Sequence, residues 1–243
     1  MAKFGLVGKH ISYSFSKGYF HRKFSELQLA GYRYENFDLE SIEEFPDMLR
    51  NNPGLVGLNV TIPYKEAIIP YLDELDVEAA RIGAVNTIKI GAGGLKGYNT
   101  DAYGFQKSLE PLLRGQHKKA LILGTGGASK AVAHVFRSLS IAFRYVSRQP
   151  GPGQLSYESL GEDIMNSHAI IVNTTPLGTH PNISEKPLVP YDLISPDHLL
   201  FDLIYNPEKT AFLQEGEKRG AQIKNGLRML ELQAEKAWEI WNS

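Results

Sequence analysis

A short apolar run at residues 119–124, KALILG, leads through a glycine turn into an amphipathic helical pattern, ASKAVAHVFRSLS. Gly124, Gly126 and Gly127 stand at this junction. Glycines there allow a tight turn and the close approach of a phosphate, while the helix N-terminus offers free N–H groups and a positive dipole end. The full GxGxxG pattern would need glycine at residue 129, where the chain has Ser129, whose hydroxyl could donate to a phosphate instead. Plain strand-to-helix turns produce many such matches, so these glycines by themselves are a weak indication of a phosphate site.

The strand that follows, AFRYVS, bears on which dinucleotide such a site would take. It ends in Ser147 and Arg148, without the acidic residue that usually accepts the ribose hydroxyls of NAD. A carboxylate would repel a ribose phosphate, whereas an arginine can pair with it through two parallel hydrogen bonds. The strand therefore favours NADP over NAD, and the alternative is an exposed surface arginine without a ligand.

The other elements indicate an α/β protein. HAIIVNTT and HLLFDLI are continuous apolar runs, typical of parallel strands buried on both faces, so the second half of the chain predicts a doubly wound, Rossmann-like sheet. Earlier, KFGLVG, YRYENFDL and GLVGLNVTI read as strands, and AVNTIKI with LKGYN as a hairpin or two paired strands. GYFHRKFSELQLA predicts a helix with Phe20, Phe24 and Leu27 on one face, and Ser41 with Glu44 forms a capping box.

Composition sets limits on function. With 243 residues, 42% of them hydrophobic, the chain can bury one large core or two small ones. A net charge of -1 gives no basic field for nucleic acid or an anionic membrane, and no cysteine is present for a disulfide, a thiolate metal site or a nucleophile. The seven histidines are scattered, so no metal is expected. No apolar stretch suits a signal peptide or membrane span, and we expect a cytoplasmic protein.

Three polar segments in the first half exceed what packing requires. Ser14 and Ser16 would share a face if SYSFS is extended, although Ser16 alone would serve as the N-cap of the next helix. In NVTIPYKE, Asn59 and Thr61 lie at the end of an apolar strand that Pro63 stops. Lys65 then falls in the first turn of a predicted helix, where a lysine opposes the helix dipole and does not stabilise the helix.

The third segment joins the hairpin to a helix. Asn86 lies among small and apolar residues in IGAVNTI, and a buried asparagine must bond to backbone or ligand. Thr100 is predicted to cap a helix that runs to about Leu113. Asp101 follows it and, taken alone, is best explained as a capping acid. Together these polar residues suit a small ligand that carries hydroxyl groups and one carboxylate.

The motifs also resemble those of one family over nearly the whole chain. SYSFS, NVTIPYKE, GAVNTI, GYNTDAYGF, GTGGASKAV, NTTPLG, DLIYNP and NGLRMLELQA stand in the order found in shikimate dehydrogenases. The resemblance implies a two-domain enzyme of aromatic amino acid and chorismate biosynthesis that interconverts 3-dehydroshikimate and shikimate with NADP. It implies a catalytic domain at residues 1–100, joined by the C-terminal helix 226–243, and an NADP-binding domain at 101–225.

The resemblance also assigns residues. It implies a catalytic pair, Lys65 and Asp101, and substrate contacts from Ser14, Ser16, Asn59, Thr61, Asn86, Tyr205 and Gln233. Ser14, Ser16 and Tyr205 suit the substrate carboxylate, and Lys65, Asn86, Asp101 and Gln233 suit the ring hydroxyls. It implies a diphosphate loop of Gly124, Gly126, Gly127, Ala128 and Ser129, and a 2′-phosphate clamp at Arg148 beside Ser147. The ribose and nicotinamide would meet Asn173, Thr174, Thr175, Leu203 and Gly226.

Three positions depart from the family pattern. Tyr13 stands where histidine is common, Lys17 where proline is common, and Ser147 where asparagine is usual. The first two leave both serine hydroxyls in place, and the third weakens the case for NADP without removing it.

Reduction of a ketone needs a hydride at carbon and a proton for the developing alkoxide. We expect Lys65 to exchange that proton and Asp101 to orient the lysine side chain. The alternatives are a quinate/shikimate dehydrogenase with relaxed use of NAD and NADP, and a non-catalytic NADP-binding sensor, in which we would expect the lysine or the aspartate to be lost. The chain is expected to act as a monomer or homodimer.

Overall fold

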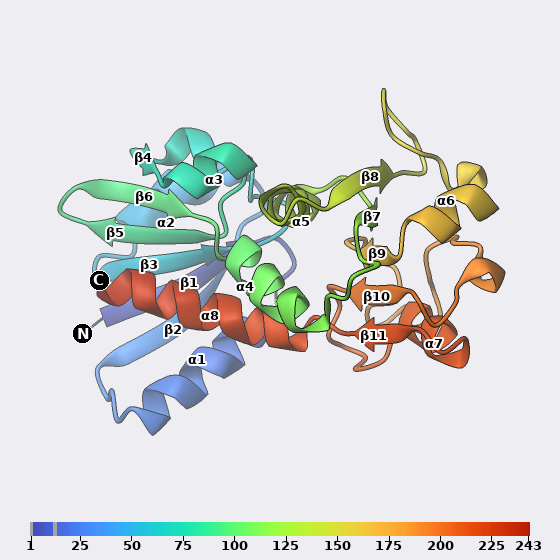
Figure 1. Cartoon of the computed structure of the whole chain (residues 1–243). Helices are drawn as coiled ribbons and strands as arrows, with labels where there is room; N and C mark the ends of the chain where they lie inside the picture. The colour runs from blue at the N-terminus through green and yellow to red at the C-terminus, as the bar shows by residue number, and fades with distance from the viewer. Residues whose placement is uncertain (1, 12–13) are drawn as a thin grey trace. The chain divides into compact units, whose positions relative to one another are not determined.

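The computed structural model describes residues 2–11 and 14–243, and the chain divides into two compact units (Figure 1). The first unit comprises residues 1–103 and 233–243, and the second comprises residues 104–232. Each unit is built on one β-sheet with helices, so the α/β class predicted from the sequence is confirmed. No helix among the described residues combines the length and apolar character that crossing a bilayer requires.

The first unit holds a six-stranded mixed sheet in the order β2-β1-β3-β5-β6-β4. Strand β1 is parallel to β2 and β3, while β5 and β6 form the predicted antiparallel hairpin. The strands are β1 (Ala2–Gly8), β2 (Tyr32–Asp38), β3 (Leu55–Val60), β4 (Glu74–Leu75), β5 (Thr87–Gly91) and β6 (Gly94–Tyr98). The helices of this part of the chain are α1 (Phe15–Glu26), α2 (Phe45–Arg50) and α3 (Val77–Ile82).

The local sequence patterns of the first unit predict the structure at some positions and not at others. Ser41 and Glu44 form the expected capping box, here on a 3-10 turn that leads into α2. Leu27, predicted on the buried face of the first helix, is instead the exposed C-cap of α1. The helix predicted to begin at Tyr64 and Lys65 does not form, and residues 62–68 are a run of turns.

The second unit holds a five-stranded sheet, all parallel, in the order β11-β10-β9-β7-β8. Its strands are β7 (Lys119–Leu123), β8 (Ala142–Val146), β9 (Ile170–Asn173), β10 (Leu199–Asp202) and β11 (Gln222–Lys224), and its helices include α5 (Gly127–Ser138), α6 (Glu162–Ser167) and α7 (Ala211–Lys218). Strands β9 and β10 are buried throughout, as their apolar runs predicted. From β7 the chain adds β8 on one side and β9 on the other, which is the doubly wound arrangement.

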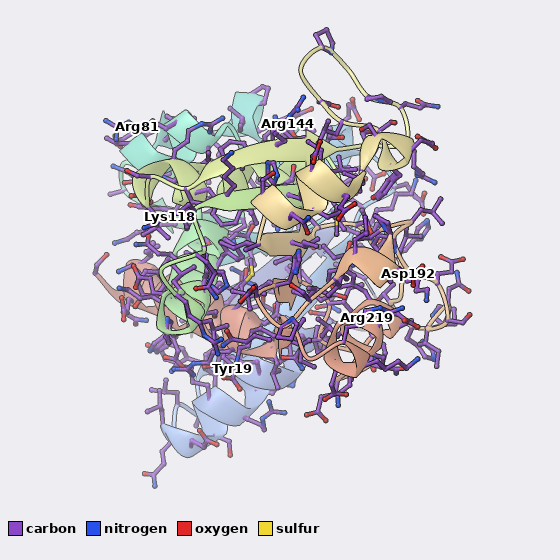
Figure 2. All side chains as sticks on the ribbon, turned by 45° about the vertical axis from the view of Figure 1, so that its right-hand side comes forward. Tyr19, Arg81, Lys118, Arg144, Asp192 and Arg219 are labelled. Carbon is purple, nitrogen blue, oxygen red and sulfur yellow. The ribbon has the colours of Figure 1, made fainter. Side chains whose placement is uncertain are left out.

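Helix α7 and strand β11 were not predicted from the sequence. Arg219 caps the C-terminal end of α7 and points toward Asp192 in a preceding 3-10 turn, with 3.1 Å between the charged atoms (Figure 2). Because Asp192 is almost fully exposed, this ion pair adds little stability.

Two helices are divided between the units, so the unit boundaries differ from those expected at 100/101 and 225/226. The first turn of α4 (Thr100–Leu109) bonds to the first unit, because the Thr100 N–H donates to Asn86 Oδ1. Further along α4, Phe105 packs on Phe136 and Phe201 of the second unit. Helix α8 (Leu227–Asn242) contributes Trp241 to an aromatic core of the first unit, but only its residues from 233 onward belong there.

Candidate active site

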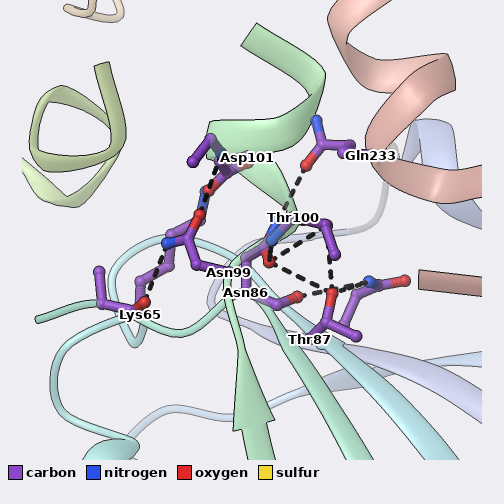
Figure 3. Close-up of polar contacts among 10 residues, drawn as sticks. Lys65, Asn86, Thr87, Asn99, Thr100, Asp101 and Gln233 are labelled. Carbon is purple, nitrogen blue, oxygen red and sulfur yellow. Dashed lines mark hydrogen bonds and ion pairs between the residues drawn. The ribbon is translucent and has the colours of Figure 1, made fainter. Parts of the chain in front are cut away.

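The two residues expected to act together, Lys65 and Asp101, form an ion pair (Figure 3). Lys65 Nζ lies 2.7 Å from Asp101 Oδ2, and the side chains are only 14% and 3% exposed. Asp101 stands in the first turn of α4, where the helix dipole favours a negative charge. The pair therefore places an ammonium, which can give up and regain a proton, at a fixed position beside a buried carboxylate.

Backbone and side-chain bonds fix the turns that carry Lys65. The Lys65 carbonyl accepts a hydrogen bond from the Val85 N–H at 2.7 Å, and the Thr61 carbonyl accepts one from the Tyr64 N–H at 2.9 Å. The buried Tyr64 hydroxyl donates to the Leu39 carbonyl at 2.7 Å. These contacts hold the lysine in place without a helix of its own, so the predicted opposition between its charge and the dipole of such a helix does not arise.

Asn86 lies immediately before β5, with 3% of its surface exposed. Its Nδ2 donates to Thr100 Oγ1 at 3.0 Å and to Gln233 Oε1 at 3.1 Å, and its Oδ1 accepts from the Thr100 N–H at 2.7 Å (Figure 3). Gln233 comes from α8, far along the chain. The structure thus brings together two of the predicted substrate residues, Asn86 and Gln233, and both bond within the protein.

The serine segment has a different geometry from the one expected. Ser14, and not Ser16, is the N-cap of α1, and its Oγ accepts from the Lys17 N–H at 3.3 Å. Ser16 is inside the helix, so the two serines do not share an extended segment. A proline at position 17 would lack this N–H, so the departure at Lys17 supplies the capping bond. Since the oxygen of Ser14 already accepts, its hydroxyl proton is left to donate. Tyr13 lies outside the described residues.

Three buried residues near this site, Thr87, Tyr34 and Asn99, were not assigned from the sequence. Thr87 Oγ1 contacts both Asn86 Oδ1 and Thr100 Oγ1, at 3.2 and 3.3 Å. Tyr34 donates its hydroxyl to Asn59 Oδ1 at 2.8 Å. Asn99, rather than Thr100, caps α4, because its Oδ1 accepts from the Ala102 N–H at 3.1 Å. The predicted helix to Leu113 ends at Leu109 and continues as a 3-10 turn over Glu110–Leu112. Thr87 adjoins Asn86 and Asn99 adjoins Thr100, both named in the sequence analysis, and that adjacency was the available signal.

In the second unit, the glycine turn leaves room for a phosphate. Gly124 has φ +105°, a conformation that favours glycine, and a Cβ there would lie 2.8 Å from Thr174 Oγ1. Gly126 is the N-cap of α5, no side chain caps this helix end, and a Cβ on Gly126 would meet nothing within 4 Å. Gly127 and Ala128 begin the helix. Ser129 is buried and donates its hydroxyl to the Gly126 carbonyl at 2.6 Å, so its predicted bond to a phosphate is replaced by one within the turn.

The end of β8 carries the two residues expected to select the ribose phosphate. Ser147 Oγ lies 3.2 Å from both the backbone nitrogen and the carbonyl oxygen of Gln149, which folds the strand end into a small turn. Arg148 is exposed, and among residues 2–11 and 14–243 it has no hydrogen-bond or ion-pair partner. The open helix end and this unpaired guanidinium fit the diphosphate and the 2′-phosphate of NADP.

The loops after β9 and β10 are held together by buried polar bonds. Asn173 Oδ1 accepts from the N–H and the hydroxyl of Thr175 at 3.0 and 2.6 Å, and Thr174 donates its hydroxyl to the Leu123 carbonyl at 2.7 Å. The fourth partner is Asp202, to which no sequence motif assigned a role. It accepts from Asn173 Nδ2, the Ile204 N–H and the Thr210 hydroxyl. Burial raises the pKa of Asp202 to about 7.

The remaining predicted residues of this unit follow β10. Gly226 allows a close backbone approach, because a Cβ there would lie 2.1 Å from the Leu203 carbonyl oxygen. Tyr205 is half-buried, and this burial raises the pKa of its hydroxyl. In the described part of the chain, no three histidine, aspartate or glutamate side chains are grouped so that they could hold a metal ion.

Comparison with known proteins gives consistent matches. Residues 6–88 match the model of the shikimate dehydrogenase substrate binding domain. A curated relative from Caldicellulosiruptor bescii, named shikimate dehydrogenase (NADP(+)), is 37% identical over 99% of this chain and 89% of its own length. The crystal structure of shikimate dehydrogenase 1 from Peptoclostridium difficile is 41% identical, with a TM-score of 0.87 over 100% of this chain and 92% of that one. The enzyme from Thermus thermophilus, in complex with NADP(H) and shikimate, has 31% identity and a TM-score of 0.87 over 99% and 93%.

Proposed function

This chain belongs to the shikimate dehydrogenase family, and we propose that it catalyses the reversible, NADP-dependent reduction of 3-dehydroshikimate to shikimate. The observation in its own structure that carries the proposal is the desolvated Lys65–Asp101 pair. A surface lysine would be solvated, whereas the Lys65 ammonium is held 2.7 Å from one carboxylate oxygen and its side chain is only 14% exposed. The pair argues against a non-catalytic sensor.

Lys65 is the acid–base group in this mechanism. A lysine side chain is an ammonium at neutral pH, so it can donate a proton to the oxygen of the ketone as the alkoxide develops. In the oxidative direction Lys65 takes the proton back from the hydroxyl. Asp101 holds the ammonium in place and accepts a hydrogen bond from a substrate hydroxyl. Bound NADP(H) supplies or accepts the hydride.

The surrounding residues would position the substrate. Asn86 and Gln233 lie within the first unit beside the first turn of α4 and suit the ring hydroxyls, as does Thr61. The Ser14 hydroxyl, whose oxygen is already used in capping α1, would donate to the substrate carboxylate, together with Ser16 and Tyr205. Asn59 contributes by holding its neighbours, because its own amide is committed to protein partners.

Residues of the second unit would bind the cofactor. The N–H groups at the open end of α5 receive the diphosphate, and Arg148 pairs with the 2′-phosphate beside Ser147. The carboxyl ends of β7 and β9 are where a doubly wound sheet binds its ligand, and there Gly124, Thr174 and Thr175 line the turn. We assign the protein to the cytoplasm as a monomer or homodimer, which fractionation and analytical ultracentrifugation would test.

The test is absorbance at the reduced-nicotinamide band with shikimate and NADP as the only additions. We expect NADPH to form, and dehydroshikimate to be consumed in the reverse assay. Assays with quinate in place of shikimate, and with NAD in place of NADP, measure the specificity for substrate and for cofactor. We expect lower activity with quinate and with NAD. Binding of NADP and shikimate without turnover, in a preparation whose thermal melt shows folded protein, would refute the proposed reaction in favour of a sensor.

A further inference from the structure

Tyr34 lies in the middle of β2 and is 1% exposed. Its ring stacks on Phe20, with 4.7 Å between the ring centroids and 12° between the planes, inside an aromatic core that includes Trp241. Phenylalanine would make the same ring contacts. A hydroxyl in this core must lose its hydration, so it is tolerated only with a partner. One such partner is Asn59 Oδ1, at 2.8 Å.

The register of the sheet explains how β2 reaches β3. Tyr34 is paired with Phe4, Asn59 with Leu6, and Phe4 and Leu6 are two residues apart on β1. Paired residues, and residues two apart on a strand, lie on the same face of a sheet. Tyr34 and Asn59 therefore share a face, and so does Thr87, which is paired with Asn59 across β3 and β5.

The direction of the hydrogen bonds that Asn59 makes in this row is determined. Asn59 Nδ2 must face the Asn86 carbonyl, at 3.3 Å, because a carbonyl can only accept. The same Nδ2 donates to Thr87 Oγ1 at 3.2 Å. Asn59 Oδ1 is then left for Tyr34, whose hydroxyl must be the donor. Thr87, having accepted from Asn59, can donate its own proton to Asn86 Oδ1 at 3.2 Å.

The row continues into the candidate active site. Asn86 Oδ1 accepts from Thr87 and from the Thr100 N–H, so its Nδ2 is turned toward Gln233. Tyr34 also interacts with the side chain of Ser16, which partly offsets the rise in the pKa of its hydroxyl that burial causes. We propose that Tyr34 is a positioning residue: its hydroxyl holds the Asn59 amide in the orientation that the Asn86 carbonyl sets and, through Thr87, supports that of Asn86, which the Thr100 N–H also holds. The effect on substrate rests on the proposed function, whereas the effect on the two amides does not.

Tyr34→Phe tests this with the ring contacts kept. The KM for shikimate should rise about tenfold, the size of effect expected when one buried acceptor loses its donor. The KM for NADP should stay within about twofold, because Tyr34 and its hydrogen-bond partners belong to the first unit, whereas the proposed cofactor residues belong to the second. The kcat should fall less than the KM for shikimate rises. Tyr191→Phe is the matched control: it removes a hydroxyl that donates to the Pro187 carbonyl at 2.7 Å in the second unit, and should leave both KM values unchanged.

Two further measurements separate positioning from a general loss of stability. In an Asn59→Ala background, Tyr34→Phe should have no additional effect on the KM for shikimate, because the Asn59 amide through which Tyr34 acts is absent. Additive effects of the two substitutions would overturn the proposal. In ¹⁵N–¹H spectra of the free protein, the side-chain NH₂ signals of Asn59 and Asn86 should shift or broaden in Tyr34→Phe and stay unchanged in Tyr191→Phe.

The spectra need no turnover, so they decide the positioning role even if the wild-type protein does not oxidise shikimate, a result that would refute only the proposed function. If Tyr34→Phe does not fold, Thr87→Val breaks the same row, and Thr87→Ser, which keeps the hydroxyl, should restore the wild-type KM for shikimate. An unchanged KM and unchanged amide signals in a folded Tyr34→Phe or Thr87→Val would show that the hydroxyl row positions nothing.

Discussion

Replacing Lys65 by methionine tests the centre of the mechanism, because methionine keeps much of the side-chain volume and removes the charge. We expect kcat to fall by about two to four orders of magnitude, the usual range for loss of a general acid–base group. The substitution also leaves the Asp101 carboxylate, 3% exposed, without its partner. Removing one member of a buried pair costs about 3–5 kcal/mol, and the 14% exposure of Lys65 places this pair near the lower figure. A loss of about 3 kcal/mol corresponds to a fall in Tm of roughly 6–12 °C.

A second substitution separates the two effects. In Lys65→Met/Asp101→Asn the unpaired charge is gone, so most of the lost Tm should return, while kcat should stay as low as in the single variant. Reduced-nicotinamide absorbance gives kcat, and calorimetry gives Tm. A single variant with turnover within a few-fold of wild type would remove Lys65 from the chemistry. A double variant that regained activity together with stability would show that the single variant had failed only because it was less folded.

Three other substitutions test the second unit. Arg148→Ala should lower kcat/KM for NADP about tenfold and leave that for NAD nearly unchanged, since an exposed charge-assisted bond is worth about 1.5 kcal/mol; equal losses would place the phosphate clamp elsewhere. Gly124→Ala introduces a Cβ 2.8 Å from Thr174 Oγ1 at φ +105°, so we expect a lower Tm and a KM for NADP raised more than that for shikimate. Burial raises the pKa of Asp202 to about 7, so its stabilising contribution is complete below the ordinary carboxyl value and is lost as pH rises through 7. The free energy of unfolding of Asp202→Asn, which imitates the protonated acid, should rise by about 2–3 kcal/mol relative to that of wild type as the pH increases from 5 to 8, measured by urea unfolding. If the difference between the two free energies does not change with pH, the carboxyl does not titrate in this range.

The parts of the fold that were predictable are those fixed by local chemistry. The strands β7, β9 and β10 are continuous apolar runs, and a parallel sheet covered on both faces is where such runs are buried. The capping box at Ser41 and Glu44 depends on only four residues, and it formed as expected. The glycine turn depends on the backbone freedom of Gly124 and Gly126, which no distant contact alters.

Where prediction failed, a contact distant in sequence had decided the local structure. Pro63 and Tyr64 resemble a helix start, but the Val85 N–H donates to the Lys65 carbonyl, which in a helix would accept a hydrogen bond from within the helix. Residues 62–68 therefore form turns instead. Similarly, the periodic pattern through Leu27 continues past the end of α1, yet Gln28 adopts φ +55° and the chain turns toward β2. Such partners are absent from the sequence pattern, so no window of neighbouring residues could have indicated them.

Asp101 shows how the structure decides between two interpretations that the sequence left open. As the second residue of a helix it could serve only to cap and to complement the dipole, which was the simpler explanation. However, Asn99 already accepts from the Ala102 N–H, so the cap does not need the Asp101 carboxylate. A carboxylate that is not needed for capping and is 3% exposed would be costly to bury unless a cation compensates it. Lys65 is that cation, and because it approaches from a separate segment after β3, the pair is an arrangement that helix formation alone does not explain.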